Sequence, residues 1–130
     1  MPTVIVRGIT DNVMWTHVFF VYEVFRAYKL AEYKLTLLGG ATTLLSLYYH
    51  RYKETRCQPW ESYAAKTCFV YILYASRVFP MEQRCILSLY TALCIATWMT
   101  QARFYEDQHA LLHVLAAAMH HKYLDFYARH

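Results

Sequence analysis

The 130-residue chain has few of the residues that interrupt helices, with only three glycines and three prolines. Because these two residues most weaken a helix interior, their scarcity favours long helices. Its four cysteines show no Cys-x-x-Cys spacing, which removes the usual sequence signature of a thiolate zinc site. We interpret the cysteines as small, buried apolar residues.

The sequence also lacks a secretory signal and a cluster of basic residues. Residues 1–8 have no basic segment followed by an apolar segment and a small-residue cleavage site, so we expect no secretory signal peptide. The net charge is +4, but the 13 Lys and Arg residues are dispersed along the chain. Since nucleic-acid-binding proteins usually carry a basic stripe, we expect no nucleic-acid partner.

Apolar and aromatic residues are abundant. The hydrophobic share is 58% and the aromatic share is 18%, with 13 tyrosines. Soluble domains have an apolar share of roughly 45–50%, and tyrosine and tryptophan are enriched at membrane–water interfaces. We therefore expect a single membrane domain over residues 1–130.

The apolar segments predict an all-α, polytopic membrane bundle of about five helices, four or five of which span the membrane. Residues 85–102 contain no Asp, Glu, Lys or Arg, which is about the length that a spanning helix needs. Asp11 or Asn12 can cap the first helix. Residues 58–62, which include Pro59 and Glu61, predict a turn before the third helix, with Ser62 as its N-cap, and Pro80 ends the third helix. The predicted helices lie near residues 12–30, 35–50, 63–79, 82–102 and 107–127, after a peripheral N-terminal arm at residues 1–11.

Two histidine motifs are the most informative feature. Ser46-x-x-x-His50 closes one apolar segment, and His109-x-x-x-His113 opens another. Positions four apart share one helix face, so three imidazoles and a hydroxyl can converge between two helices. Three histidines and a water molecule form a zinc site with an open fourth position.

These motifs resemble the signatures of the CREST superfamily, which includes alkaline ceramidases, progestin and adiponectin receptors and myomaker-like proteins. The resemblance covers roughly residues 20–125 and includes Tyr105 four residues before His109. It implies that His50, His109 and His113 bind zinc and that Ser46 matches the family serine. The chain departs from the family in having room for about five helices rather than seven. It also has no aspartate within residues 63–79, where the family has one.

Charged residues within the apolar segments favour a different function. Glu23, Arg26, Lys66 and Arg77 would each cost several kcal/mol in lipid unless they were paired or faced protein or water. We therefore expect a non-catalytic accessory subunit of a larger membrane complex, with other membrane subunits and lipids as partners and no cofactor. The expected location is the mitochondrial inner membrane, in a complex of the respiratory-chain or ATP-synthase type.

Two alternatives stay open. The first is a CREST-type zinc-dependent amidase or lipid hydrolase of an endomembrane, in which His50, His109 and His113 hold the metal and Ser46 assists. The second is a haem-binding electron-transfer anchor, since imidazole is a common axial ligand of haem. His17 and the histidines at residues 120–121 are also candidates to form polar networks with these two motifs, as an alternative to a metal site.

Overall fold

A computed structural model describes residues 7–52, 56, 58–101 and 105–130, and within these residues all regular structure is helical. The predicted all-α class is confirmed for them. Residues 1–6 of the predicted N-terminal arm lie outside the described residues. The helices are α1 (Asn12–Trp15), α2 (His17–Lys29), α3 (Tyr33–Tyr52), α4 (Gln58–Ala75), the 3-10 turn η1 (Ser76–Val78), α5 (Met81–Thr100) and α6 (Tyr105–Ala128).

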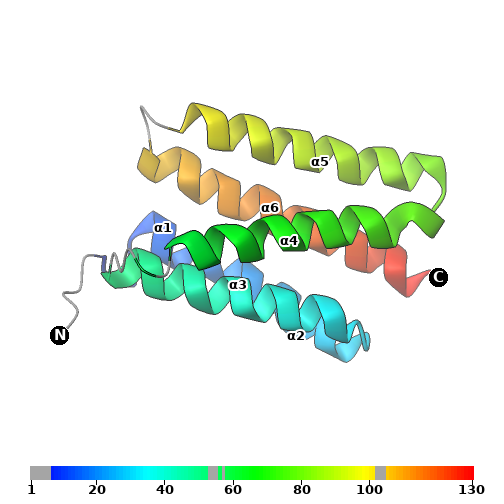
Figure 1. Cartoon of the computed structure of the whole chain (residues 1–130), viewed down its shortest axis with the longest axis horizontal. Helices are drawn as coiled ribbons and strands as arrows, with labels where there is room; N and C mark the ends of the chain where they lie inside the picture. The colour runs from blue at the N-terminus through cyan, green and yellow to red at the C-terminus, as the bar shows by residue number, and fades with distance from the viewer. Residues whose placement is uncertain (1–6, 53–55, 57, 102–104) are drawn as a thin grey trace.

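The long helices run roughly side by side along the longest axis of the molecule (Figure 1). Helix α3 packs against α2 and α4, while α6 packs against α5, α2 and α1. Helix α5 therefore lies at one edge, with α6 as its main neighbour. The apolar core forms where these helices meet and includes Leu35, Ile72, Leu87, Tyr123 and Leu124.

The segment predicted as one helix at residues 12–30 is divided at Thr16. The side chain of Asp11 accepts a hydrogen bond from the Val13 backbone N–H at 2.9 Å and caps α1. The Thr16 hydroxyl donates to the Asn12 carbonyl oxygen at 2.7 Å. Thr16 and His17 are both buried, so this break turns two polar side chains toward the interior.

Helix α4 begins at Gln58, five residues before the predicted start at residue 63. Pro59 made the segment resemble a turn, but proline is tolerated in the first turn of a helix, where its missing N–H has no intrahelical partner. Ser62, predicted as the N-cap, therefore lies inside the helix. The earlier start also places Glu61 on the first turn of α4.

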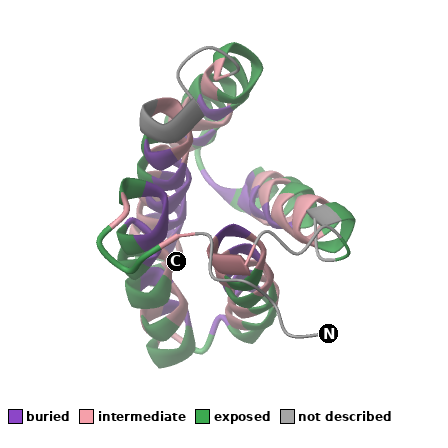
Figure 2. Ribbon diagram, turned by 90° about the vertical axis from the view of Figure 1, so that its left-hand side faces the viewer, coloured by how far each residue is buried: buried purple, intermediate pink, exposed green. Residues whose placement is uncertain are grey.

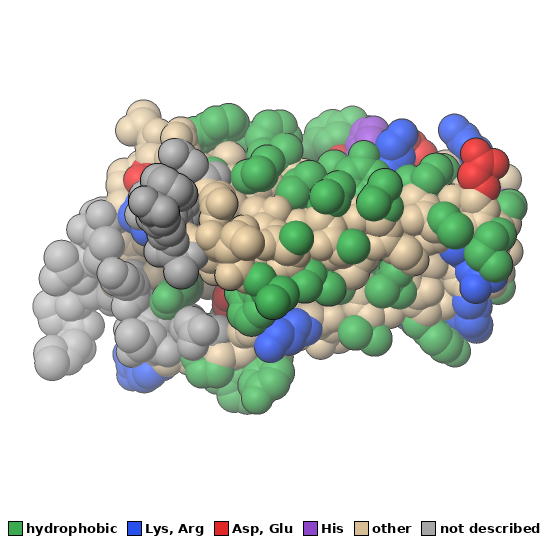
Figure 3. Space-filling view, turned by 90° about the horizontal axis from the view of Figure 1, so that it is seen from above, with side chains coloured by type: hydrophobic (Ala, Val, Ile, Leu, Met, Phe, Trp, Pro, Cys, Tyr) green, Lys and Arg blue, Asp and Glu red, His purple; other side chains and the backbone are tan. Residues whose placement is uncertain are grey.

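The helices turn many apolar side chains outward and several polar side chains inward. On α2, His17 and Glu23 are buried, whereas Val18, Val21 and Phe25 are each more than half exposed. Figure 2 shows the exposed residues on the outer sides of the helices. On the face shown in Figure 3, hydrophobic side chains cover the middle, and several Lys and Arg side chains gather toward one end.

The sequence predicted four or five membrane-spanning helices. Among the described residues, no helix combines the length and the hydropathy needed to cross a membrane. Hydroxyl and imidazole side chains within the helices lower their hydropathy. Helix α3, for example, carries Thr42, Thr43, Ser46 and His50 within nine residues.

Candidate metal centre

The three histidines singled out by the sequence come together where the end of α3 meets the first half of α6. His50 is buried in the last turn of α3, and His109 and His113 are one turn apart on α6. The Nε2 atoms of His50 and His109 are 2.9 Å apart. One ring nitrogen from each of the three histidines lies within 4.8 Å of the other two. The structure therefore brings together all three predicted ligands.

Two neighbours set the tautomers of His109 and His113. The Thr16 hydroxyl lies 2.9 Å from His113 Nδ1. Because its only hydrogen goes to the Asn12 carbonyl, it accepts the hydrogen bond from His113 Nδ1–H. The side-chain oxygen of Gln101 lies 3.0 Å from His109 Nδ1 and, because it can only accept, it accepts from that N–H. Both histidines thus have the lone pair on Nε2, the nitrogen needed for a metal. The lone pair of His109 accepts from His50 Nε2–H at 2.9 Å, so His50 moves this proton to Nδ1 when its Nε2 binds a metal.

Ser46, the predicted assisting residue, is buried beside the cluster and bonded to His17. The Nδ1 atom of His17 lies 3.0 Å from the Met14 carbonyl oxygen, which can only accept, so Nδ1 carries the proton. The Nε2 atom then accepts from the Ser46 hydroxyl at 2.8 Å. The His17 ring also contacts the His113 ring, with 4.4 Å between centroids. The oxygen of Ser46 therefore keeps its lone pairs for another donor.

Burial favours the neutral form of His50 and His113 in the cluster. It lowers the pKa of His50 to about 2, with a further contribution from nearby His109, and it lowers the pKa of His113 well below 6.5. The pKa of His17 is also lowered, mainly by burial. Neutral imidazole is the form that binds a metal, so no deprotonation is required of these rings near neutral pH.

The residues present fit a zinc ion. Zinc binds histidine nitrogens at about 2.0–2.1 Å, so two ligands of a tetrahedral ion lie about 3.3 Å apart. The nitrogens of His50 and His109 are 2.9 Å apart and the whole set lies within 4.8 Å, so shifts of about an ångström would adjust the three rings to that geometry. Within the part of the chain that the structure describes, the group consists of three nitrogen ligands and no fourth, which matches the open type of site.

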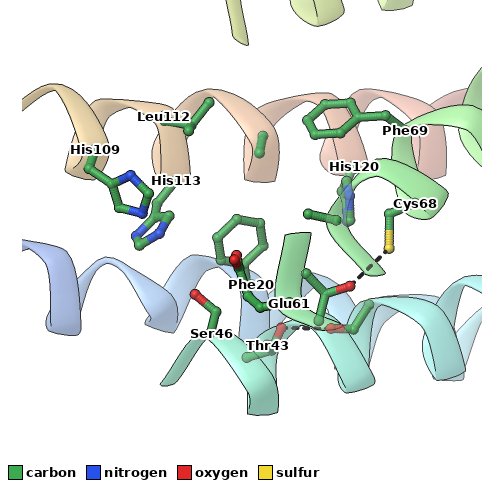
Figure 4. A pocket seen from close by; sticks show the side chains of 14 residues that line it. Phe20, Thr43, Ser46, Glu61, Cys68, Phe69, His109, Leu112, His113 and His120 are labelled. Carbon is green, nitrogen blue, oxygen red and sulfur yellow. Dashed lines mark hydrogen bonds between the residues drawn. The ribbon is translucent and has the colours of Figure 1, made fainter. Parts of the chain in front are cut away.

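A cavity of about 90 Å³ adjoins the cluster between α3, α4 and α6 (Figure 4). Ser46, His109 and His113 line it, and Glu61 reaches it from the first turn of α4. Burial raises the pKa of the Glu61 carboxyl above its ordinary value. The cavity therefore holds a carboxyl group that keeps a proton to higher pH than an exposed glutamate does.

Sequence reasoning missed Thr16, Gln101 and Glu61. Thr16 is 97 residues from its partner His113, and Gln101 lies at the end of the segment before α6, so no local pattern marks either residue. Glu61 was interpreted as part of a turn. The signal that could have found it is the first-turn proline at residue 59, which permits an earlier helix start.

Comparison with family models, with curated proteins and with solved structures found no match to this chain. The resemblance to the CREST superfamily therefore stays a prediction.

Proposed function

We propose that this protein is a zinc-dependent hydrolase that cleaves an amide or ester bond. The observation that carries the proposal is the convergence of His50, His109 and His113, with one ring nitrogen of each within 4.8 Å of the others. The hydrogen bonds of His109 and His113 to Gln101 and Thr16 support it, because such second partners fix the ring that binds a metal. When bound at an open site of this kind, zinc supplies Lewis acidity and activates water.

The other residues of the cavity supply proton transfer and orientation. Glu61, with its raised pKa, suits the donation of a proton to a leaving nitrogen or oxygen. Ser46 directs its hydrogen to His17, so its oxygen accepts a hydrogen bond from a group in the cavity. His17 is the positioning residue for Ser46, and Met14 fixes its tautomer.

Zinc content and turnover of four proteins test this proposal. After incubation with zinc and desalting, we expect one zinc per chain in the unaltered protein and in the control His130→Ala, which changes an exposed histidine bonded to Gln83. We expect His113→Ala to lose the zinc. Glu61→Gln should retain zinc but lose turnover by about 10²- to 10⁴-fold on a panel of amides and esters. An unaltered protein without bound zinc, or with zinc and no turnover, would contradict the proposal.

The outward apolar faces support a second candidate, a non-catalytic accessory subunit of a membrane complex in the mitochondrial inner membrane. Large side chains such as Leu37, Leu44 and Leu89 are each at least 60% exposed. Extended apolar surface of this kind is usually covered by protein or lipid. The partners proposed here are other membrane subunits and lipids, and such a subunit requires no metal.

Native electrophoresis of the organelle membranes tests the second candidate. We expect the chain to stay with the inner membrane after alkaline extraction and to migrate in a large complex, with His113→Ala weakening assembly because it leaves Thr16 without its buried partner. Migration at the mass of the single chain would contradict it. The haem alternative gains no support, because the Nε2 atoms of His50 and His109 are in hydrogen-bond contact and leave no space for a macrocycle between them.

A further inference from the structure

The cavity beside the histidine cluster has a second polar end at His120. This side chain lines the cavity and is only 5% exposed. Its ring packs near Phe20, with 6.1 Å between centroids. Among the described residues no hydrogen bond to its ring nitrogens is found, and these nitrogens are not among the fully buried polar atoms, so they retain surface that faces the cavity. A buried polar group is costly to leave unpaired, so His120 is equipped to bind a group that enters the cavity.

The two polar ends are separated by an apolar middle. His120 follows His113 by seven residues on α6, which is two helical turns or about 10 Å along the axis. Phe20, Leu112 and Ala116 line the cavity, and Figure 4 shows His109 and His113 on one side of Phe20 and His120 on the other. A ligand that contacts both ends therefore needs an apolar chain between two polar groups.

The size of the cavity limits the length of that chain. Its volume is about 90 Å³. An apolar cavity of about 150 Å³ in another protein holds one benzene molecule of six non-hydrogen atoms, so by proportion this one accepts a ligand portion of about four non-hydrogen atoms. A chain of about four atoms reaches the two ends of the cavity together with the polar group that it carries at each of its own ends.

We propose that this cavity binds a short-chain carboxylic amide or ester whose chain ends in a hydrogen-bonding group held by His120. The proposal rests on the proposed hydrolase function, which places the carbonyl end beside His50, His109 and His113. His120 is then the residue that determines specificity. Because its pKa is lowered to about 4 by burial, its ring is neutral near pH 7 and can donate from one nitrogen and accept at the other.

Two hydroxamate probes of equal chain length test this inference by direct binding. The hydroxamate group ligates zinc, and the six-carbon chain ends either in a methyl group or in a primary carboxamide. Calorimetry on the zinc-loaded protein should show about tenfold tighter binding of the carboxamide probe, since it pairs an otherwise unpaired buried group. His120→Leu should abolish this difference at unchanged zinc content. The control His130→Leu changes an exposed histidine and should preserve it.

A second variant keeps the inference falsifiable if His120→Leu does not fold. Ala116 is 7% exposed and lies between His113 and His120 on α6, so Ala116→Leu fills the middle of the cavity. It should retain zinc and weaken both probes at least tenfold. Equal affinities of the two probes for a zinc-loaded protein, or full affinity of both probes for Ala116→Leu, would overturn this inference alone. A protein that binds no zinc would overturn the proposed function and this inference with it.

Discussion

At the scale of single residues, Thr16 connects the helix break to the candidate metal centre. Its hydroxyl donates to the Asn12 carbonyl oxygen and accepts from His113 Nδ1–H. We expect Thr16→Val, which keeps the shape and removes the acceptor, to lower zinc affinity by about 10- to 100-fold. Competitive zinc titration measures this change.

The control for that prediction is Thr100→Val on α5. Thr100 is exposed and its hydroxyl bonds only within its own helix, to the Ala96 and Thr97 carbonyl oxygens. The zinc affinity of the Thr100→Val variant should equal that of the unaltered protein. Equal affinities for both valine variants would show that Thr16 does not orient His113.

His120 gives a prediction about pH. Burial lowers its pKa to about 4 in the folded protein, whereas the ordinary value is 6.5. Between these values the unfolded chain binds more protons, so the free energy of unfolding decreases as the pH falls, by about 1.4 kcal/mol per pH unit for one such group. Urea unfolding between pH 6 and pH 4.5 should therefore show a shallower decrease for His120→Leu. The same slope in the variant as in the unaltered protein would contradict this assignment.

The site could be predicted from sequence only in part. Helical spacing selected Ser46, His50, His109 and His113, because residues four apart share a face. Spacing could not show that His50 meets His109 across 59 residues, since that contact depends on how α3 packs relative to α6. The same limit hid Thr16, whose partner lies in a helix distant in sequence.

At the scale of helices, Glu32 joins the corner between α2 and α3 to α4 and α6. It follows Ala31, which has a φ of 60°, at the corner between α2 and α3. Its buried carboxyl accepts hydrogen bonds from the Tyr71 hydroxyl of α4, at 2.9 and 3.0 Å, and from the Tyr123 hydroxyl of α6 at 2.6 Å. This corner is thereby fixed to two other helices.

Removing one of these donors should destabilise the fold. We expect Tyr123→Phe to lower the free energy of unfolding by about 1–3 kcal/mol, because it removes a hydrogen bond from a buried carboxyl group. The matched control is Tyr127→Phe, one turn later on α6, where the hydroxyl has no hydrogen-bond partner among the described residues. Chemical unfolding compares the two, and equal stabilities would show that the Glu32 contact contributes nothing.

Helix boundaries show why the sequence predicted the elements better than their ends. The segment at 35–50 became α3 at Tyr33–Tyr52, a difference of two residues at each end. The sequence did not predict the division at Thr16, because the apolar pattern continues through it. The hydrogen bond from the Thr16 hydroxyl to the Asn12 carbonyl oxygen depends on the local backbone geometry, which the pattern does not show. The start of α4 was missed because proline marks both turns and first helical turns.

At the scale of the whole molecule, composition indicated an apolar environment but not which side of each helix would face it. Helix α2 shows the difference. Its polar residues His17 and Glu23 point inward, and Glu23 bonds to His121 of α6 at 2.8 Å. Its apolar residues Val18, Val21 and Phe25 point outward. Apolar and polar residues at helical spacing predict that a helix is amphipathic. Which of its two faces is buried depends on the polar contacts that it makes with other helices.

This outward apolar surface should make the isolated chain self-associate in aqueous buffer. We expect the double variant Val18→Gln/Phe25→Gln to reduce the associated fraction in sedimentation velocity, because both side chains are more than half exposed. Substitutions at such exposed positions should change folding stability by no more than about 0.5 kcal/mol each, so loss of association would not reflect unfolding. The control Ile9→Gln alters a side chain that is 71% exposed but lies outside the helices, and it should leave association unchanged. If the double variant associates as strongly as the unaltered chain, the outer face of α2 is not the surface that requires a partner.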